Sequence, residues 1–245
     1  MRDRERRYLA GRLQGGRRPA HIGRKFAPDG QALSCPGITT LAHVPKDSDA
    51  QAALIEAQAA LAAAPGADAF TFLPPESFHM TLFDGVIDDR RTEGEWIVDL
   101  PLDAEMAEVR DAARQRLRRL TTVPREVRVR PTGIFGGFSV EMTGADTGEE
   151  ARLRRGRDAI SAALGLRRPD HDAYPFHITL GYLLRWLAPV EIEEVIARSQ
   201  AAAETLIARA PVFTLGPFEL CAFEDMRRFA PMMRLGDRPT THVWR

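Results

Sequence analysis

One short pattern occurs twice in this chain, almost unchanged. It reads Phe-His-Met-Thr-Leu at residues 78–82 and Phe-His-Ile-Thr-Leu at residues 176–180. Neighbouring side chains of an extended strand point to opposite faces, so each copy places a histidine and a threonine on one face and three apolar side chains on the other. Each copy therefore predicts a strand that packs on a core and presents an imidazole beside a hydroxyl on its free face.

The elements around the two copies repeat as well. The order strand, helix, histidine strand, helix, strand is predicted over roughly residues 37–131 and again over roughly 136–236. Corresponding glycines, helix caps and histidines are offset by about 98–99 residues, which indicates an internal duplication. We therefore expect an α+β fold with two lobes, each an antiparallel sheet backed by helices. The two sheets would face each other across a central groove, with the histidine strands meeting at its floor.

The predicted helices have recognisable ends. Ser48 with Gln51 and Thr147 with Glu150 form capping boxes at the start of two of them. Gly165 ends the second of these helices, because glycine readily adopts the left-handed conformation of a helix C-cap.

The two ends of the chain are expected to lie outside the repeat. Residues 1–36 are interpreted as a basic arm and lead-in, because the first part is rich in arginine and glycine and has little periodicity. We expect this arm to be mobile or loosely docked, and an RNA-binding extension is the alternative. Residues 37–236 form the bilobal domain, closed by a predicted hairpin of 212–223 and 229–235. Residues 237–245 are a C-terminal tail.

Composition excludes several classes of protein. The 34 basic residues balance the 34 acidic ones, so no overall charge favours a nucleic-acid coat or a membrane-surface protein. Cys35 and Cys221 are too few for a disulfide framework and fit no metal-ligand spacing, which points to a reducing compartment. No apolar run approaches the ~20 residues that span a bilayer. We expect a cytoplasmic monomer without membrane association, and the sequence implies no protein partner.

A pair of histidines suits one kind of chemistry. Imidazole titrates near pH ~6.5 in model peptides, so near neutrality one ring can be a free base while another carries a proton. Cleavage of a phosphodiester needs that combination, because the attacking oxygen loses a proton and the departing oxygen gains one. Thr81 and Thr179 would add hydroxyl donors for the phosphoryl oxygens beside His79 and His177.

Rival chemistries have weaker support. A zinc site would need a third Cys, His or carboxylate at ligand spacing, and none stands near the two motifs. The sequence also lacks a GxSxG elbow, a GxGxxG turn and a Walker loop. We therefore expect neither a metal nor another cofactor.

The chain resembles the 2H phosphoesterase superfamily, whose mark is two H-x-[ST] motifs on strands of a duplicated, bilobal α+β fold. The resemblance covers about residues 37–236 and implies metal-independent 2',3'-cyclic phosphodiesterase or related RNA-end and nucleotide chemistry. By position, it implies that His79 and His177 are general acid and base, and that Thr81 and Thr179 bind the phosphoryl oxygens. It leaves open which histidine plays which role.

The substrate is less specified than the chemistry. The residues flanking both motifs resemble an uncharacterised bacterial and fungal branch, rather than the RNA cyclic phosphodiesterases and 2'-5' RNA ligases. The expected partner is a nucleotide or RNA-end phosphodiester substrate. Two alternatives stay open: a non-catalytic nucleotide- or RNA-binding module, and an RNA 2'-5' ligase.

Strand alternation suggests further candidates for the groove. Phe83 continues the face of His79 and Thr81, so it is a candidate for stacking on a base, with a core role at the groove edge as the alternative. Alternation in the predicted strands also nominates Phe223 and Arg130, and the turn after the arm nominates Lys25.

Overall fold

The two histidine strands lie side by side. In the computed structural model, which describes residues 2–236, β3 (His79–Phe83) pairs antiparallel with β6 (His177–Thr179) through Met80 opposite Ile178. Both of these apolar side chains are fully buried in one core. The prediction that the histidine strands meet is confirmed.

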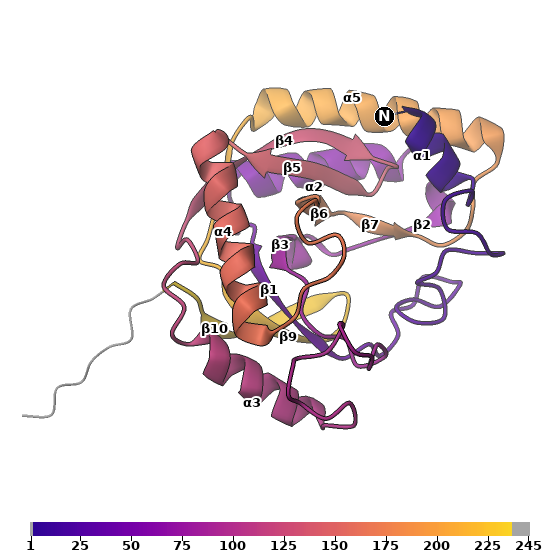
Figure 1. The fold of residues 1–245 in the computed structure, drawn as a ribbon. Coiled ribbons are helices and arrows are strands. Elements are labelled where there is room, and N and C mark those ends of the chain that lie inside the picture. The colour runs from indigo at the N-terminus through magenta and orange to yellow at the C-terminus, as the bar shows by residue number, and fades with distance from the viewer. Residues whose placement is uncertain (1, 237–245) are drawn as a thin grey trace, which may run out of the picture.

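These strands form the middle of one eight-stranded antiparallel sheet. Its order is β10-β9-β1-β3-β6-β5-β4-β8. Figure 1 shows the sheet curling from β4 and β5 at the top of the view to β9 and β10 at the bottom. The remaining strands are β1 (Gly37–His43), β4 (Val127–Phe135), β5 (Ser139–Gly144), β8 (Phe213–Leu215), β9 (Glu219–Asp225) and β10 (Arg228–Arg234).

The α+β class is as predicted, but the strands are not divided into two separate sheets. The β3–β6 pairing joins the two halves, so one sheet runs through the expected boundary. Each half also gives a strand to the other. β4 follows the first histidine strand but pairs with β5, and β9 follows the second but pairs with β1. The backbone N–H and C=O groups of β3 and β6, which would lie at the open edges of two separate sheets, are thus paired with each other.

Five α-helices of the described chain surround this sheet. α5 packs on β4 and on α2, whereas α4 packs on β3, β4 and β5 and also touches α3. Apolar side chains from α2, α3, α4, the C-terminal part of α5 and the sheet share one large core, whereas Leu9 of α1 packs with the N-terminal part of α5 in a smaller one. The helices are α1 (Arg2–Leu9), α2 (Asp49–Ala62), α3 (Met106–Leu117), α4 (Thr147–Leu164) and α5 (Pro189–Arg209), with short 3-10 turns at Ala67–Ala69 and Pro75–Ser77.

One of the two predicted helix caps is correct, and the other lies one residue earlier than predicted. Ser48 caps α2 by accepting a hydrogen bond from the Gln51 amide. For α4 the cap is Asp146 rather than Thr147, since the Asp146 carboxylate accepts from the Glu149 amide. Asp and Thr both serve as N-caps, and here the aspartate one residue earlier takes the position.

The predicted closing hairpin is only partly right. β9 and β10 pair as expected, but residues 213–215 leave them and pair with β4 at the other edge of the sheet. The break falls at Gly216, whose φ is +145° and where a side chain would meet the Arg125 carbonyl oxygen at 2.2 Å. Pro217 follows and has no N–H to donate to a ladder, so one long strand cannot pass through this point.

The N-terminal segment is docked, which corrects the expectation of a mobile or loosely docked arm. α1 lies beside α5 (Figure 1), with Leu9 fully buried and the Arg6 guanidinium 2.6 Å from the Glu193 carboxylate. The buried Glu5 carboxylate accepts a hydrogen bond from the Gly136 amide. Farther along, Phe26 is fully buried against the Tyr182 ring. The predicted tail, residues 237–245, lies outside the described residues.

One short ribbon was not predicted. β2 (Phe70–Phe72) pairs with β7 (Gly181–Leu183), which directly follows the second histidine strand. This ribbon carries Tyr182 to the pocket described below. Among residues 2–236, no helix is both long and apolar enough to cross a membrane.

Candidate phosphoesterase site

Both motifs open on one pocket. This pocket has a volume of about 210 Å³, and His79, Thr81, His177 and Thr179 all line it. The structure thus brings together the four residues that the sequence nominated from segments about a hundred positions apart. The other lining residues used below are Lys25, Asp84, Arg90, Arg168, Tyr174, Tyr182, Phe223 and Phe229.

The β3–β6 register explains this convergence. Because Met80 lies opposite Ile178 in an antiparallel ladder, the flanking positions place His79 opposite Thr179 and Thr81 opposite His177. Cβ atoms of such opposite residues lie about 4.5–5.5 Å apart. Met80 and Ile178 point into the core, so the four polar side chains point together to the other face. Each imidazole therefore has a hydroxyl across the ladder as well as one along its own strand.

Both imidazoles are held in the same way. His79 Nδ1 lies 2.6 Å from the carbonyl oxygen of Ser77, and His177 Nδ1 lies 2.8 Å from that of Pro175. A carbonyl oxygen only accepts, so each Nδ1 carries the proton that it donates. In the neutral ring Nε2 is then left with a lone pair, free to exchange protons with a ligand in the pocket.

His79 lies in the less polar surroundings. Its ring centroid is 4.3 Å from that of Phe229 and 6.3 Å from that of His43. Burial lowers the pKa of His79 to about 4, and the nearby His43 and His177 act in the same direction, against the Ser77 carbonyl. Low dielectric and like charge both disfavour the imidazolium. The His79 imidazole is therefore neutral at physiological pH.

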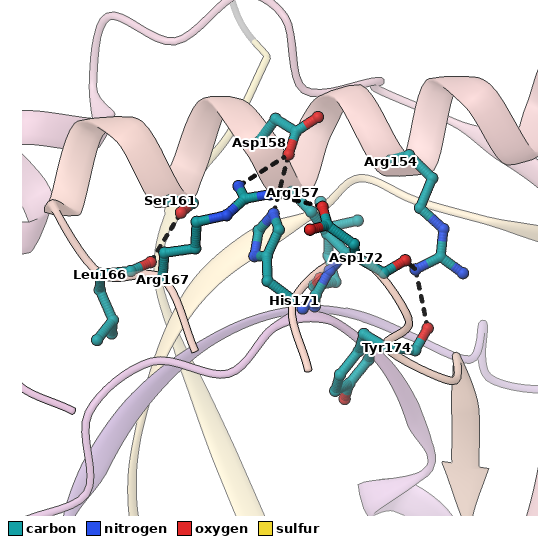
Figure 2. Close-up of polar contacts among 10 residues, drawn as sticks. Arg154, Arg157, Asp158, Ser161, Leu166, Arg167, His171, Asp172 and Tyr174 are labelled. Atoms are coloured by element: carbon teal, nitrogen blue, oxygen red, sulfur yellow. Dashed lines mark hydrogen bonds and ion pairs between the residues drawn. The ribbon is translucent and has the colours of Figure 1, made fainter. Parts of the chain in front are cut away.

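The loop between α4 and β6 forms one wall of the pocket and is tied to α4. Figure 2 shows Asp158 of α4 between two residues of this loop: its carboxylate lies 2.9 Å from His171 Nε2 and 3.4 Å from Arg167. Ser161 donates to the Leu166 carbonyl, and Arg154 donates to that of Tyr174. These contacts fix the segment that carries Arg168 and Tyr174.

Two tyrosines of the pocket were missed by the sequence reasoning. Tyr174 is buried, with the Arg157 guanidinium 3.9 Å from its ring centroid and its hydroxyl 3.4 Å from Asp84. Burial raises the pKa values of Tyr174 and Tyr182, so both stay neutral donors. Tyr174 stands three residues before His177, but Tyr182 follows the end of β6, where the alternation from His177 and Thr179 no longer applies. Only its nearness to the motif could have nominated it.

Of the four further candidates that the sequence suggested for the groove, two line the pocket. Lys25 and Phe223 line it. Phe83 does not: it is buried, with the Arg157 guanidinium 5.5 Å from its ring centroid. The register against β1 skips a residue between Thr81 and Phe83, and this bulge turns Phe83 away from the face of His79.

Arg130 does not line this pocket either. It is an exposed residue of β4, which lies two strands away from β6 in the sheet. It borders a separate surface hollow with Thr143, Glu150 and Arg154. Alternation predicted its outward direction correctly, but it does not predict how far a strand lies from the centre of the sheet.

The potential metal ligands of residues 2–236 lie elsewhere. Two groups of three are close enough to share an ion: His43 with Glu219 and Cys221, and Asp158 with His171 and Asp172. Neither group contains His79 or His177. In each of those two histidines Nδ1 is hydrogen-bonded to a backbone carbonyl oxygen, so only Nε2 is available to contact a ligand.

Known proteins place the chain in a family. The family model described as 2H-phosphodiest, a domain of unknown function (DUF1868), matches residues 25–137. The crystal structure of the conserved protein of unknown function ATU0111 from Agrobacterium tumefaciens str. C58 is similar, with 32% identity and a TM-score of 0.89. That match covers 94% of this chain and 98% of the other.

More distant structures also match. Apo LigT of E. coli is 14% identical with a TM-score of 0.43, covering 82% of this chain and 97% of that one. Usb1 of Kluyveromyces marxianus is 14% identical with a TM-score of 0.41, covering 81% and 98%. No curated protein matches. On its identity to ATU0111 over nearly the whole of both chains, and on the family model, the chain belongs to the 2H phosphoesterase-related DUF1868 family.

Proposed function

We propose that this protein is a metal-independent phosphodiesterase that hydrolyses a 2',3'-cyclic phosphate or a related RNA or nucleotide phosphodiester. One observation carries the proposal: a single pocket is lined by two imidazoles and two threonine hydroxyls from paired strands. In addition, both rings donate from Nδ1 to the backbone, so both have Nε2 free for proton transfer.

The surroundings of His79 support one assignment of the two roles. His79 is the general base, because its lowered pKa keeps Nε2 unprotonated at neutral pH. It takes a proton from a water molecule as the water oxygen attacks phosphorus. His177 is the general acid and gives a proton to the ribose oxygen as the bond between that oxygen and phosphorus breaks. The product is a phosphomonoester.

The hydroxyls complete the proposed machinery. Charge builds on the non-bridging phosphoryl oxygens in the transition state, and fixed donors aimed at them lower its energy. Thr81 and Thr179 are such donors, each opposite an imidazole across the ladder. Hydroxyls carry no charge, so they do not disturb the proton transfers from the water to His79 and from His177 to the ribose oxygen.

Turnover of nucleoside 2',3'-cyclic phosphates by the purified protein tests this function. We expect a bell-shaped dependence of kcat/KM on pH, and a loss of about 10²–10⁴-fold in either His79→Asn or His177→Asn. Circular dichroism and thermal unfolding would show that both variants keep the fold. Binding of 2'-AMP or 3'-AMP without hydrolysis of any cyclic nucleotide would instead support a non-catalytic binding module.

A further inference from the structure

Three cationic side chains line the pocket without belonging to either histidine motif. Lys25 comes from the N-terminal segment, Arg90 from the loop after β3, and Arg168 from the loop between α4 and β6. Asp84 is the only carboxylate residue among the lining residues. Leaving the histidines aside, the lining therefore has an excess of two positive charges, which favours an anionic ligand.

Lys25 has no anionic partner in the described chain. Within residues 2–236 its ammonium has no carboxylate within 4 Å and makes no hydrogen bond, and it lies 5.7 Å from the centroid of the Tyr182 ring. Burial lowers the pKa of Lys25. Keeping an ammonium in such surroundings without a partner costs free energy, and a bound anion would offset that cost.

Both arginines have N–H donors that lack a carboxylate oxygen at hydrogen-bonding distance. Arg90 Nη1 is 3.7 Å and Arg168 Nε is 4.0 Å from the same Glu95 oxygen, and Arg168 Nη1 is 3.9 Å from Asp84. All three distances exceed the 2.7–3.2 Å of a good N–H···O hydrogen bond. Arg168 Nη2 does donate to the Gly85 carbonyl, but its Nε is buried without an acceptor. A buried donor without an acceptor is unusual, so the protein satisfies the Arg168 guanidinium only in part.

These cations are not needed for the bond-breaking step described above. The paired strands supply the base, the acid and the hydroxyl donors, whereas Lys25, Arg90 and Arg168 come from three other segments that converge on the same pocket. Glu95 lies between the two arginines, which places their guanidinium groups close to each other.

We propose, building on the proposed function, that the substrate carries a second phosphate besides the phosphodiester that is cleaved, and that Lys25, Arg90 and Arg168 bind it. The substrate class is then a nucleoside 2',3'-cyclic phosphate with a further phosphate on the 5' side. Guanidinium groups donate in pairs to phosphate oxygens, and the Lys25 ammonium adds a point charge.

The kinetic test uses two matched substrates, adenosine 2',3'-cyclic phosphate with and without a 5'-phosphate. We expect kcat/KM to be about 10–100-fold higher for the 5'-phosphorylated substrate, as loss of a charged hydrogen bond commonly costs that factor. In Lys25→Met, which keeps the apolar stem over Tyr182, kcat/KM should fall more for the 5'-phosphorylated substrate than for the unphosphorylated one, so that this preference shrinks towards unity.

The chain offers a matched control. Lys46 is exposed and is the only other lysine of the sequence, so Lys46→Met makes the same chemical change outside the pocket and should keep the preference. Equal turnover of both substrates by the unmodified protein would overturn the proposal. So would an equal loss on both substrates in Lys25→Met, because the lysine would then serve the phosphodiester itself.

A binding measurement separates this proposal from the proposed function. Calorimetry should show adenosine 3',5'-bisphosphate binding about 10–100-fold more tightly than adenosine 3'-monophosphate, with the difference lost in Lys25→Met. Reductive methylation read by mass spectrometry should show Lys25 protected by the bisphosphate and Lys46 unprotected. If these results hold while no cyclic phosphate is hydrolysed, the second phosphate site stands and the catalytic function fails. Equal affinity for the two nucleotides overturns the site, whatever the turnover.

Discussion

Met80 lies opposite Ile178 in the β3–β6 ladder, and both side chains are fully buried. β6 has only three residues, so this one pair largely sets the register of the two histidine strands. A slip by one residue would exchange the faces of a strand and move its histidine into the core. The alignment of the polar pocket therefore depends on an apolar contact on the other side of the sheet.

The first prediction concerns this contact. Met80→Ala or Ile178→Ala should lower the free energy of unfolding by about 2–5 kcal/mol, because each removes fully buried apolar volume and leaves a cavity. Urea unfolding measures this loss. Ile55→Ala, on an α2 residue that is 40% exposed, is the matched control and should change the stability by less than about 1 kcal/mol. Similar losses at Ile55 and Met80 would show that the Met80–Ile178 contact contributes no more to the free energy of unfolding than a partly exposed side chain does.

The second prediction concerns the hydroxyls. Thr81→Val and Thr179→Val keep the shape of the side chain but remove its donor, so each should lower kcat about 10–10³-fold with a smaller effect on KM. Thr→Ser at either position should restore most of the rate. Thr205→Val, on the exposed face of α5, should leave the kinetics unchanged. A Val variant that raises KM at unchanged kcat would assign the hydroxyl to ground-state binding.

The third prediction concerns metal removal. Incubation with EDTA followed by gel filtration should leave turnover unchanged, because the groups of three potential ligands found in residues 2–236 include neither pocket histidine. Elemental analysis of the treated protein verifies the removal. Loss of turnover that returns on adding Zn²⁺ would replace acid–base catalysis by metal-assisted hydrolysis.

Local signals explain what the sequence analysis predicted well. The alternation in each H-x-T copy places its histidine and threonine on one face, whatever the strand pairs with, and the structure has them so. Ser48 and Gly165 mark helix ends through their own hydrogen bonding and conformation, which neighbouring residues alone decide.

Long-range pairing explains what the sequence analysis could not provide. The repeated motif predicts that the two histidine strands meet, but no local pattern indicates that they pair directly with each other, and this pairing is what makes a single sheet. The bulge that buries Phe83 arises from the register against β1, which also depends on distant residues. The pocket residues Arg90 and Arg168 lie in loops, where no periodicity reveals the direction of a side chain.

The last prediction concerns pH and stability at His79. Its folded pKa of about 4 lies below the ~6.5 of an unfolded chain, so between these values the unfolded chain binds the extra proton. The free energy of unfolding should therefore rise as pH increases from about 4 to about 6.5, and this contribution should be level above that. A full shift of this size corresponds to at most about 3 kcal/mol.

Carboxylates with lowered pKa values, such as Glu191, give a slope of the same sign at lower pH, so the comparison must be made with a variant. Urea unfolding of the unmodified protein and of His79→Asn at half-unit intervals isolates the histidine. We expect the stability of the unmodified protein relative to His79→Asn to increase by about 2–3 kcal/mol across the window, because asparagine does not titrate there. Parallel curves would mean that His79 has the same pKa folded and unfolded, and would remove the reason for assigning it as the base.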